Sequence, residues 1–189
     1  MHDLLEDPKG RPLGTQMTAE YAVEFVTAVT KLGIDLWVDG GWAVDALLGE
    51  QTRAHADLDI VIQQRDLPEL RAWLEARGFY EVERDYSTAW NFVLGDGRGH
   101  EIDVHLIVLD EEGNGIYGPP ERGVMYPAAA LTGTGFIGGL PLKCISPEWL
   151  VAFHTGYEPL DTDDHDVAAL CRRFGIDVPD DYAHLRERS

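Results

Sequence analysis

Two aspartates alternate with apolar residues in the run Asp57-Leu58-Asp59-Ile60, and this pattern constrains the fold more than any other part of the chain. Residues i and i+2 of a strand point to the same face, so the pattern predicts a strand with Leu58 and Ile60 in the core and both carboxylates projecting together. Two like charges about 4 Å apart repel by roughly 1 kcal/mol in water and by about 4 kcal/mol at an effective dielectric constant of 20. A fold that holds such a pair usually supplies a cation, and carboxylate oxygens favour a hard ion such as Mg²⁺ or Mn²⁺.

A third aspartate, Asp103, lies in a second predicted strand, 101–109, where its apolar neighbours point to the opposite face. If this strand pairs beside the first, Asp103 completes a three-carboxylate cluster with Asp57 and Asp59 that can hold one or two metal ions. Asp103 is then the natural general base for an attacking hydroxyl group. His105 follows on the same predicted face, and we expect it to assist or to bind substrate.

The glycine pair Gly40-Gly41 lies between a predicted strand, 36–38, and a predicted helix, 42–48. Glycines at such a junction let the backbone approach a ligand closely, and the N–H groups of the following helix form a site for an anion such as a triphosphate. Three basic side chains are predicted to contact the phosphate oxygens: Arg53, His55 and Lys143.

The pattern along the whole chain predicts an α+β domain with a mixed sheet flanked by helices. Apolar residues recur at helical spacing in 18–32 and 163–174, and short apolar or alternating runs indicate strands in the middle. Residues 1–17 are predicted to form a flexible N-terminal arm. Residues 18–189 are predicted to form a single domain whose C-terminal part, from about residue 146, is helical.

The charge balance narrows the class of partner. The 189 residues include 15 Lys and Arg against 34 Asp and Glu, which gives a formal net charge of −19. Binding to a polynucleotide needs basic surface that neutralises phosphates, so we expect no nucleic-acid partner, whereas cationic small molecules are attracted. No apolar run reaches the roughly 20 residues that span a bilayer, and the acidic N-terminus lacks a signal-peptide pattern, so we expect a cytoplasmic protein without a membrane partner.

The order of these motifs resembles the nucleotidyltransferase superfamily, in which a hydrophobic-x-Gly-Gly segment precedes Asp-x-Asp and a third aspartate on a later strand. The run 36–49 followed by Thr52-Arg53-x-His55-x-Asp57-x-Asp59 is similar to the branch that modifies antibiotics, the lincosamide nucleotidyltransferases and the aminoglycoside 2″-nucleotidyltransferases. Further segments resemble the lincosamide group: 102–105, 144–148 and 153–158. The resemblance covers residues 18–175.

The resemblance implies a polymerase-beta-like nucleotidyltransferase fold and a reaction. It implies that Asp57 and Asp59 bind Mg²⁺ and that Asp103 is the third carboxylate and the base. It also implies that Gly40 and Gly41 contact the nucleotide phosphates. The implied reaction moves a nucleoside monophosphate from an NTP to a hydroxyl of a small-molecule antibiotic and releases pyrophosphate. The later segments favour a lincosamide acceptor slightly over an aminoglycoside.

The acceptor is less constrained. Tyr157 and Glu158 are predicted to line its site together with the loop 110–131, and Glu158 begins a run of five carboxylates that can hold an amine-bearing drug. Acids at a helix start also interact favourably with the helix dipole, which is a purely structural reading of the same run. Two other functions stay open: transfer to a metabolite or a protein side chain, and nucleotide binding without turnover. The aromatic content also allows a homodimer.

Overall fold

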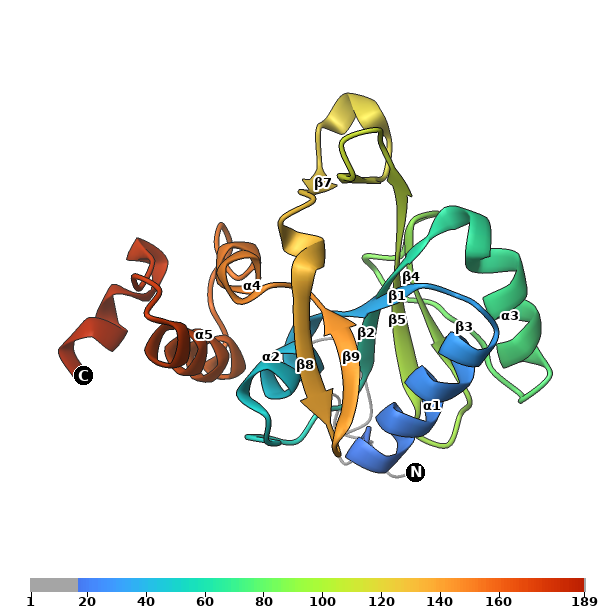
Figure 1. Cartoon of the computed structure of the whole chain (residues 1–189), viewed down its shortest axis with the longest axis horizontal. Helices are drawn as coiled ribbons and strands as arrows, with labels where there is room; N and C mark the ends of the chain where they lie inside the picture. Colours follow the sequence, from blue (N-terminus) through green and yellow to red (C-terminus); the bar gives the residue numbers. More distant parts are fainter. Residues whose placement is uncertain (1–16, 189) are drawn as a thin grey trace.

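The computed structural model describes residues 17–188, and their side chains through residue 186. Its α-helices are α1 (Ala19–Lys31), α2 (Gly40–Leu48), α3 (Leu67–Glu75), α4 (Pro147–Phe153) and α5 (Asp161–Phe174). Figure 1 shows a central sheet with α1 and α3 beside one end and α2, α4 and α5 beside the other. The predicted α+β class, with a mixed sheet flanked by helices, is confirmed.

The sheet places the two predicted aspartate strands side by side. The main path of the described sheet runs β3 (Tyr80–Val82), β4 (Asn91–Gly95), β5 (Glu101–Leu109), β2 (Leu58–Gln63), β1 (Leu36–Val38), β9 (Leu140–Cys144) and β8 (Gly133–Ile137). β2 is parallel to β5 and antiparallel to β1, so the sheet is mixed. The register of β2 and β5 pairs Asp59 with Asp103.

The core forms on the apolar faces that the alternation predicts. Leu58, Ile60, Ile102 and Val104 are all 0% exposed, and their neighbours Asp59 and Asp103 therefore project from the other face. Helix α1 packs against the sheet and begins directly after Thr18. The hydroxyl of Thr18 caps the helix by accepting a hydrogen bond from the backbone N–H of Tyr21. Its buried face consists of Ala22, Phe25, Val26 and Val29.

Helix α2 begins at Gly40, two residues before the predicted start, and Asp39 is its N-cap. Oδ1 of Asp39 accepts a hydrogen bond from the Gly40 N–H at 2.8 Å. The glycine pair therefore forms the first turn of the helix rather than a loop before it. At Gly135 of β8 a Cβ atom would collide with the backbone of Ala46, so α2 lies directly against that strand and is held in place by it.

The segment 110–131, predicted as a loop, contains the short strands β6 (Gly115–Tyr117) and β7 (Met125–Tyr126), near the top of Figure 1. They pair with each other, and β6 also extends the sheet by pairing with the end of β5. Strands of three and two residues give no alternation long enough to be recognised in a sequence. This hairpin brings Tyr126 back to the carboxylate face of the sheet, as described below.

Met17 and the C-terminal elements both pack onto the domain. Residues 1–16 of the predicted arm lie outside the described residues, whereas Met17 is 1% exposed and its N–H donates to the carbonyl of His55 at 2.7 Å. Met17 therefore belongs to the core rather than to the arm. The C-terminal part consists of α4, α5 and the 3₁₀ segment Asp180–Arg188. Within the described part of the chain, every helix is too short or too polar to cross a membrane.

Candidate active site

Asp59 and Asp103 meet on adjacent parallel strands, and His105 joins them from β5. One ligand atom of each of these three residues lies within 4.8 Å of the other two. Asp103 is only 3% exposed, and the other two are half-buried. Asp57, which precedes β2, lines the same cavity as Asp59, but the set of mutually close ligand atoms does not include it. The predicted convergence of carboxylates is thus strongest for the pair on the two strands.

The carboxylate of Asp103 is oriented by hydrogen bonds from β4 and the segment before it. The side-chain amide of Asn91 donates to Oδ1 at 2.6 Å, and the hydroxyl of Tyr86 donates to Oδ2 at 3.4 Å. Nε2 of His105 lies 3.6 Å from Oδ1. Burying a carboxylate costs free energy unless hydrogen-bond donors such as these replace its lost hydration. These contacts hold the Asp103 oxygens in one orientation beside Asp59.

A chain of polar contacts runs from His105 to the start of α2 through Tyr126. Nδ1 of His105 lies 2.9 Å from the Tyr126 hydroxyl, which donates a hydrogen bond to Oδ2 of Asp39 at 2.9 Å. Burial, and next to it the charge of Asp39, raise the pKa of Tyr126 well above its usual value, so this phenol keeps its proton at neutral pH. Asp39 in turn caps Gly40. The chain therefore connects the carboxylate cluster to the glycine turn.

A cavity of about 820 Å³ opens beside Asp59, which is within the usual size range of small-molecule sites. One wall is the glycine turn with the segment 53–59, and the other is the segment that joins α4 to α5. The lining residues are Gly40, Gly41, Arg53, Ala54, His55, Ala56, Asp57, Asp59, His154, Tyr157, Pro159, Leu160, Asp161, Thr162 and Asp163. The C-terminal helices are thus part of the site.

Both glycines of the turn are required by close contacts. Gly40 has a φ of +56°, and a Cβ atom there would collide with the carboxylate of Asp59. A Cβ atom on Gly41 would collide with the guanidinium of Arg53 and would lie 2.6 Å from Nδ1 of His55. Because neither position has a side chain, Asp59 of β2 and the side chains of Arg53 and His55 can all approach the N-terminus of α2.

Arg53 is fixed at the cavity wall by helix α5. Its Nε and one terminal nitrogen donate to the two carboxylate oxygens of Asp166 at 2.9 and 2.6 Å, and Asp166 is 1% exposed. Burial opposes the charge of Arg53, but the hydrogen bonds and the charge of Asp166 raise its pKa above the usual value. The guanidinium therefore stays cationic at the edge of the cavity while it ties the C-terminal helices to the rest of the domain.

His55 is 4% exposed and pairs through Nε2 with Asp45, a buried acid inside α2. Asp45 also accepts hydrogen bonds from the backbone N–H and the hydroxyl of Thr52 at 2.9 and 2.6 Å. Burial raises the pKa of Asp45, but these hydrogen bonds outweigh it, and the pKa lies below its usual value. The pair fixes the imidazole so that its Nδ1 edge lies beside Gly41.

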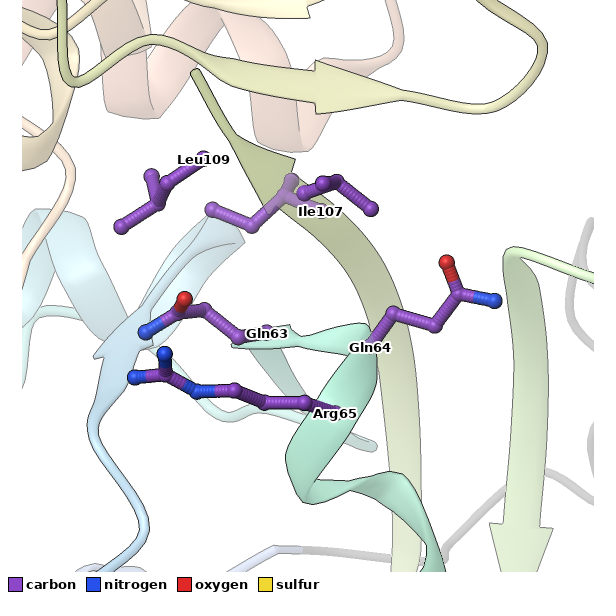
Figure 2. A pocket seen from close by; sticks show the side chains of 6 residues that line it. Gln63, Gln64, Arg65, Ile107 and Leu109 are labelled. Carbon is purple, nitrogen blue, oxygen red and sulfur yellow. The ribbon is translucent and has the colours of Figure 1, made fainter. Parts of the chain in front are cut away.

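Another cavity, of about 420 Å³, lies at the far ends of β2 and β5. Figure 2 shows the side chains of Gln63 and Arg65 extending to the same side, with Leu109 above them and Gln64 pointing the other way. Its lining residues include no carboxylate: Gln63, Gln64, Arg65, Ile107, Val108 and Leu109. The cavity beside Asp59 borders the carboxylate cluster and is the candidate active site.

Comparison with known proteins identifies the family of this chain. The family model for aminoglycoside-2″-adenylyltransferases matches residues 22–170, which include the glycine turn, both aspartate strands and most of α5. The chain belongs to this family. As a member, it is a nucleotidyltransferase of the kind that confers antibiotic resistance.

Relatives within and near this family include enzymes for both drug classes. The chain is 30% identical to a lincosamide resistance protein of Staphylococcus haemolyticus over 138 residues, 72% of this chain and 84% of that protein. It is also 30% identical to a 2″-aminoglycoside nucleotidyltransferase of Klebsiella pneumoniae over 137 residues, 72% and 71% of the two chains. The lincomycin-bound lincosamide adenylyltransferase LnuA superposes with a TM-score of 0.73 and 26% identity, over 82% of this chain and 97% of that one.

A second solved structure supports the fold alone. ANT(2″)-Ia in complex with adenylyl-2″-tobramycin superposes with a TM-score of 0.64 at 23% identity, over 90% of this chain and 97% of that chain. Together with LnuA, it shows that this member of the aminoglycoside-2″-adenylyltransferase family has the nucleotidyltransferase fold.

Four residues predicted for the site of this family member are not among the cavity-lining residues. Asp103 and His105 lie beside Asp59 at its edge, whereas Lys143 and Glu158 lie apart from it. Lys143 forms an exposed pair with Asp35 at 2.6 Å and lies over the ring of Trp37, because the alternation along β9 turns it outward between buried neighbours. Glu158 is exposed and is not among the cavity-lining residues, although its neighbour Tyr157 is. Neither placement supports the predicted contact with nucleotide or acceptor.

Several polar residues around the site had no individual prediction from the sequence. They are Asp39, Asp45, Tyr86, Asn91, Tyr126 and Asp166. Asp39 stands directly before the glycine pair, in a position where an acidic helix cap is common, and Asp45 is an acid within an otherwise apolar helix. Both are detectable signals. Tyr126 and Asn91 have none, because only the folded strands bring them beside Asp103 and His105.

Proposed function

We propose that this protein uses a divalent metal ion, Mg²⁺ or Mn²⁺, to transfer a nucleoside monophosphate from an NTP to a hydroxyl of a small-molecule antibiotic. Pyrophosphate is the second product. The observation that carries the proposal is the pairing of Asp59 with Asp103 on parallel strands, beside the N-terminus of α2. Like charges held this close favour a bound cation.

The donor set fits such an ion. Asp59 and Asp103 offer carboxylate oxygens, His105 offers a ring nitrogen, and Asp57 borders the same cavity. Oxygen donors suit Mg²⁺ and Mn²⁺. When bound, the ion would neutralise charge on the transferring phosphoryl group and lower the pKa of the attacking hydroxyl. In this proposal Asp57, Asp59 and Asp103 hold one or two ions.

The nucleotide occupies the cavity with its phosphates at the glycine turn. The N-terminus of α2 favours an anion, and Gly40 and Gly41 leave the backbone accessible to it. Arg53 and His55 stand on the same wall and can reach phosphate oxygens. Because the chain carries a net charge of −19, the local positive charge of Arg53 and the N-terminus of α2 are needed to accept a triphosphate.

The acceptor lies beside Asp103, against the β6–β7 hairpin. Tyr117 and Tyr126 form an aromatic wall with His105, whose ring centroid is 5.7 Å from that of Tyr117. Asp103 takes the proton of the attacking hydroxyl, and the amide of Asn91 keeps its carboxylate turned toward the reaction. Tyr157 on the cavity wall is the other proposed contact.

A lincosamide is the favoured acceptor. Lincomycin-bound LnuA is matched over 97% of its length with the higher TM-score of the two solved structures described above. Lincosamides carry a basic nitrogen, and the strongly acidic surface of this chain attracts a cationic molecule. An aminoglycoside, which is also cationic, is the competing substrate class.

The proposal is tested by incubating the protein with Mg²⁺, ATP or GTP, and lincomycin, clindamycin, kanamycin or tobramycin, and measuring product masses. We expect a nucleoside-monophosphate adduct on a lincosamide, with turnover reduced at least about 100-fold by Asp103→Asn. Asp35→Asn, the same change at an exposed site paired with Lys143, is the matched control. Absence of any drug adduct rejects the antibiotic assignment, and adducts on a protein or metabolite instead identify the other acceptor class.

A further inference from the structure

The hydroxyl of Tyr126 has one proton and two polar neighbours, and this limits where the proton of His105 can lie. The hydroxyl donates to Oδ2 of Asp39 at 2.9 Å, and a carboxylate in that position accepts hydrogen bonds. Oδ1 of the same carboxylate already accepts from the Gly40 N–H. The phenol proton is thus used in the hydrogen bond to Asp39. The phenol oxygen can therefore only accept a hydrogen bond from Nδ1 of His105, 2.9 Å away.

The opposite nitrogen of His105 then carries the lone pair. A neutral imidazole has one N–H and one acceptor nitrogen, so an Nδ1–H tautomer leaves Nε2 as the acceptor. Nε2 is 3.6 Å from Oδ1 of Asp103, and His105 has a ligand atom within 4.8 Å of both Asp59 and Asp103. Two carboxylate oxygens and a ring nitrogen within 4.8 Å of one another are close enough to share one cation.

We propose that Nε2 of His105 is a nitrogen ligand of the divalent metal ion, and that Tyr126 is the positioning residue that fixes its tautomer. The inference rests on the metal-dependent function proposed above and adds a nitrogen ligand to the carboxylate oxygens of that site. The arrangement is the usual outer-shell geometry of a metal-bound histidine, whose second nitrogen donates to an oxygen. A nitrogen ligand favours Mn²⁺ over Mg²⁺, because Mg²⁺ prefers oxygen.

The packing around Tyr126 allows its hydroxyl to be tested separately from its ring. The residue is 6% exposed, and its ring packs edge-on against Tyr117 and Phe153, with centroids 5.7 and 5.2 Å away. Tyr126→Phe keeps these contacts and removes the acceptor for the His105 Nδ1–H. Tyr182→Phe is the matched control, because Tyr182 is also buried and its hydroxyl donates to the carbonyl of His154 at 2.6 Å.

The experiment measures Mn²⁺ binding to the full chain by electron paramagnetic resonance, with pulsed spectra of protein labelled with ¹⁵N-histidine. We expect Mn²⁺ in the wild type to show a histidine nitrogen coupling that changes from ¹⁴N to ¹⁵N on labelling, and that disappears in His105→Gln. Tyr126→Phe should weaken Mn²⁺ binding by about 10-fold, in the range typical of outer-shell partners. Tyr182→Phe should leave the Mn²⁺ affinity within about 2-fold of wild type. Circular dichroism establishes that each variant is folded.

The outcomes separate this inference from the proposed function. Mn²⁺ bound without a histidine coupling overturns the ligand assignment and leaves the metal-dependent transfer intact. An unchanged Mn²⁺ affinity in Tyr126→Phe overturns the positioning role. If the wild type binds no Mn²⁺, with or without ATP, both this inference and the metal-dependent function are rejected.

Discussion

Replacing Gly40 with alanine would test whether the glycine turn and the carboxylate strand need to be in contact. Gly40 has a φ of +56°, where a residue with a Cβ atom costs roughly 1–2 kcal/mol. The new Cβ atom would lie 2.8 Å from Cγ of Asp59, and ordinary contact begins at 3.4 Å, so the carboxyl carbon has to move by 3.4 − 2.8 = 0.6 Å. Since a displacement of about 1 Å can reduce turnover about 100-fold, we expect a loss of about 10- to 100-fold.

Gly49→Ala is the matched control at the other end of the same helix. Gly49 has a φ of +80°, and a Cβ atom there would have no described atom within 4 Å. Gly49→Ala should therefore lose about 1 kcal/mol of stability, equivalent to a fall of roughly 2–4 °C in Tm for a chain of this size, and Gly40→Ala should lose at least as much. Thermal unfolding and nucleotidyl transfer are measured on both. The reasoning is refuted if Gly40→Ala transfers nucleotide as fast as Gly49→Ala.

Contacts around and away from the site can be tested by single substitutions. Asp166→Asn removes the charged partner of Arg53 and should lower the free energy of unfolding by about 2–3 kcal/mol in urea titrations; an unchanged midpoint contradicts the role of this ion pair. Burial raises the pKa of Asp96, but hydrogen bonds from His100 and two backbone N–H groups outweigh it and lower the pKa from 3.8 to about 2. The folded state therefore gains roughly 2 kcal/mol of stability, which is present above pH 4 and is lost as the pH falls toward 2. Urea titrations between pH 5 and 2.5 should show this loss in the wild type and a smaller loss in Asp96→Asn, and equal slopes would rule it out. Lys143→Ala should leave the KM for the NTP within about 2-fold of wild type, because Lys143 lies outside the cavity, and a tenfold rise would restore it as a phosphate ligand.

The central geometry was accessible from sequence because it depends on a period of two. Alternation at 57–60 and 102–104 predicts which side chains share a face, and the family resemblance supplies the pairing of the two strands. The register that sets Asp59 beside Asp103 is a property of the folded sheet, since no local pattern specifies which residues of two parallel strands face each other. The predicted start of α2 lies two residues too late, because glycines are poor helix formers except near a helix end.

The contacts that orient the site lie largely beyond sequence reasoning. Tyr126 is on a two-residue strand within a segment that reads as a loop, so its contact with His105 depends on how the hairpin folds back. Asp166 is 113 positions from Arg53, and the helical pattern of α5 marks it only as one acid among several. Lys143 shows the opposite case. The alternation of β9 already places it on the exposed face, and its basic charge alone suggested a phosphate contact.

A crystal grown with MnCl₂ and a non-hydrolysable ATP analogue, examined at a wavelength where manganese scatters anomalously, tests the metal site most directly. We predict an anomalous peak about 2.0–2.3 Å from carboxylate oxygens of both Asp59 and Asp103, with the triphosphate at the N-terminus of α2. A manganese peak bound elsewhere, or a nucleotide bound in the cavity without any peak between these two aspartates, would contradict it.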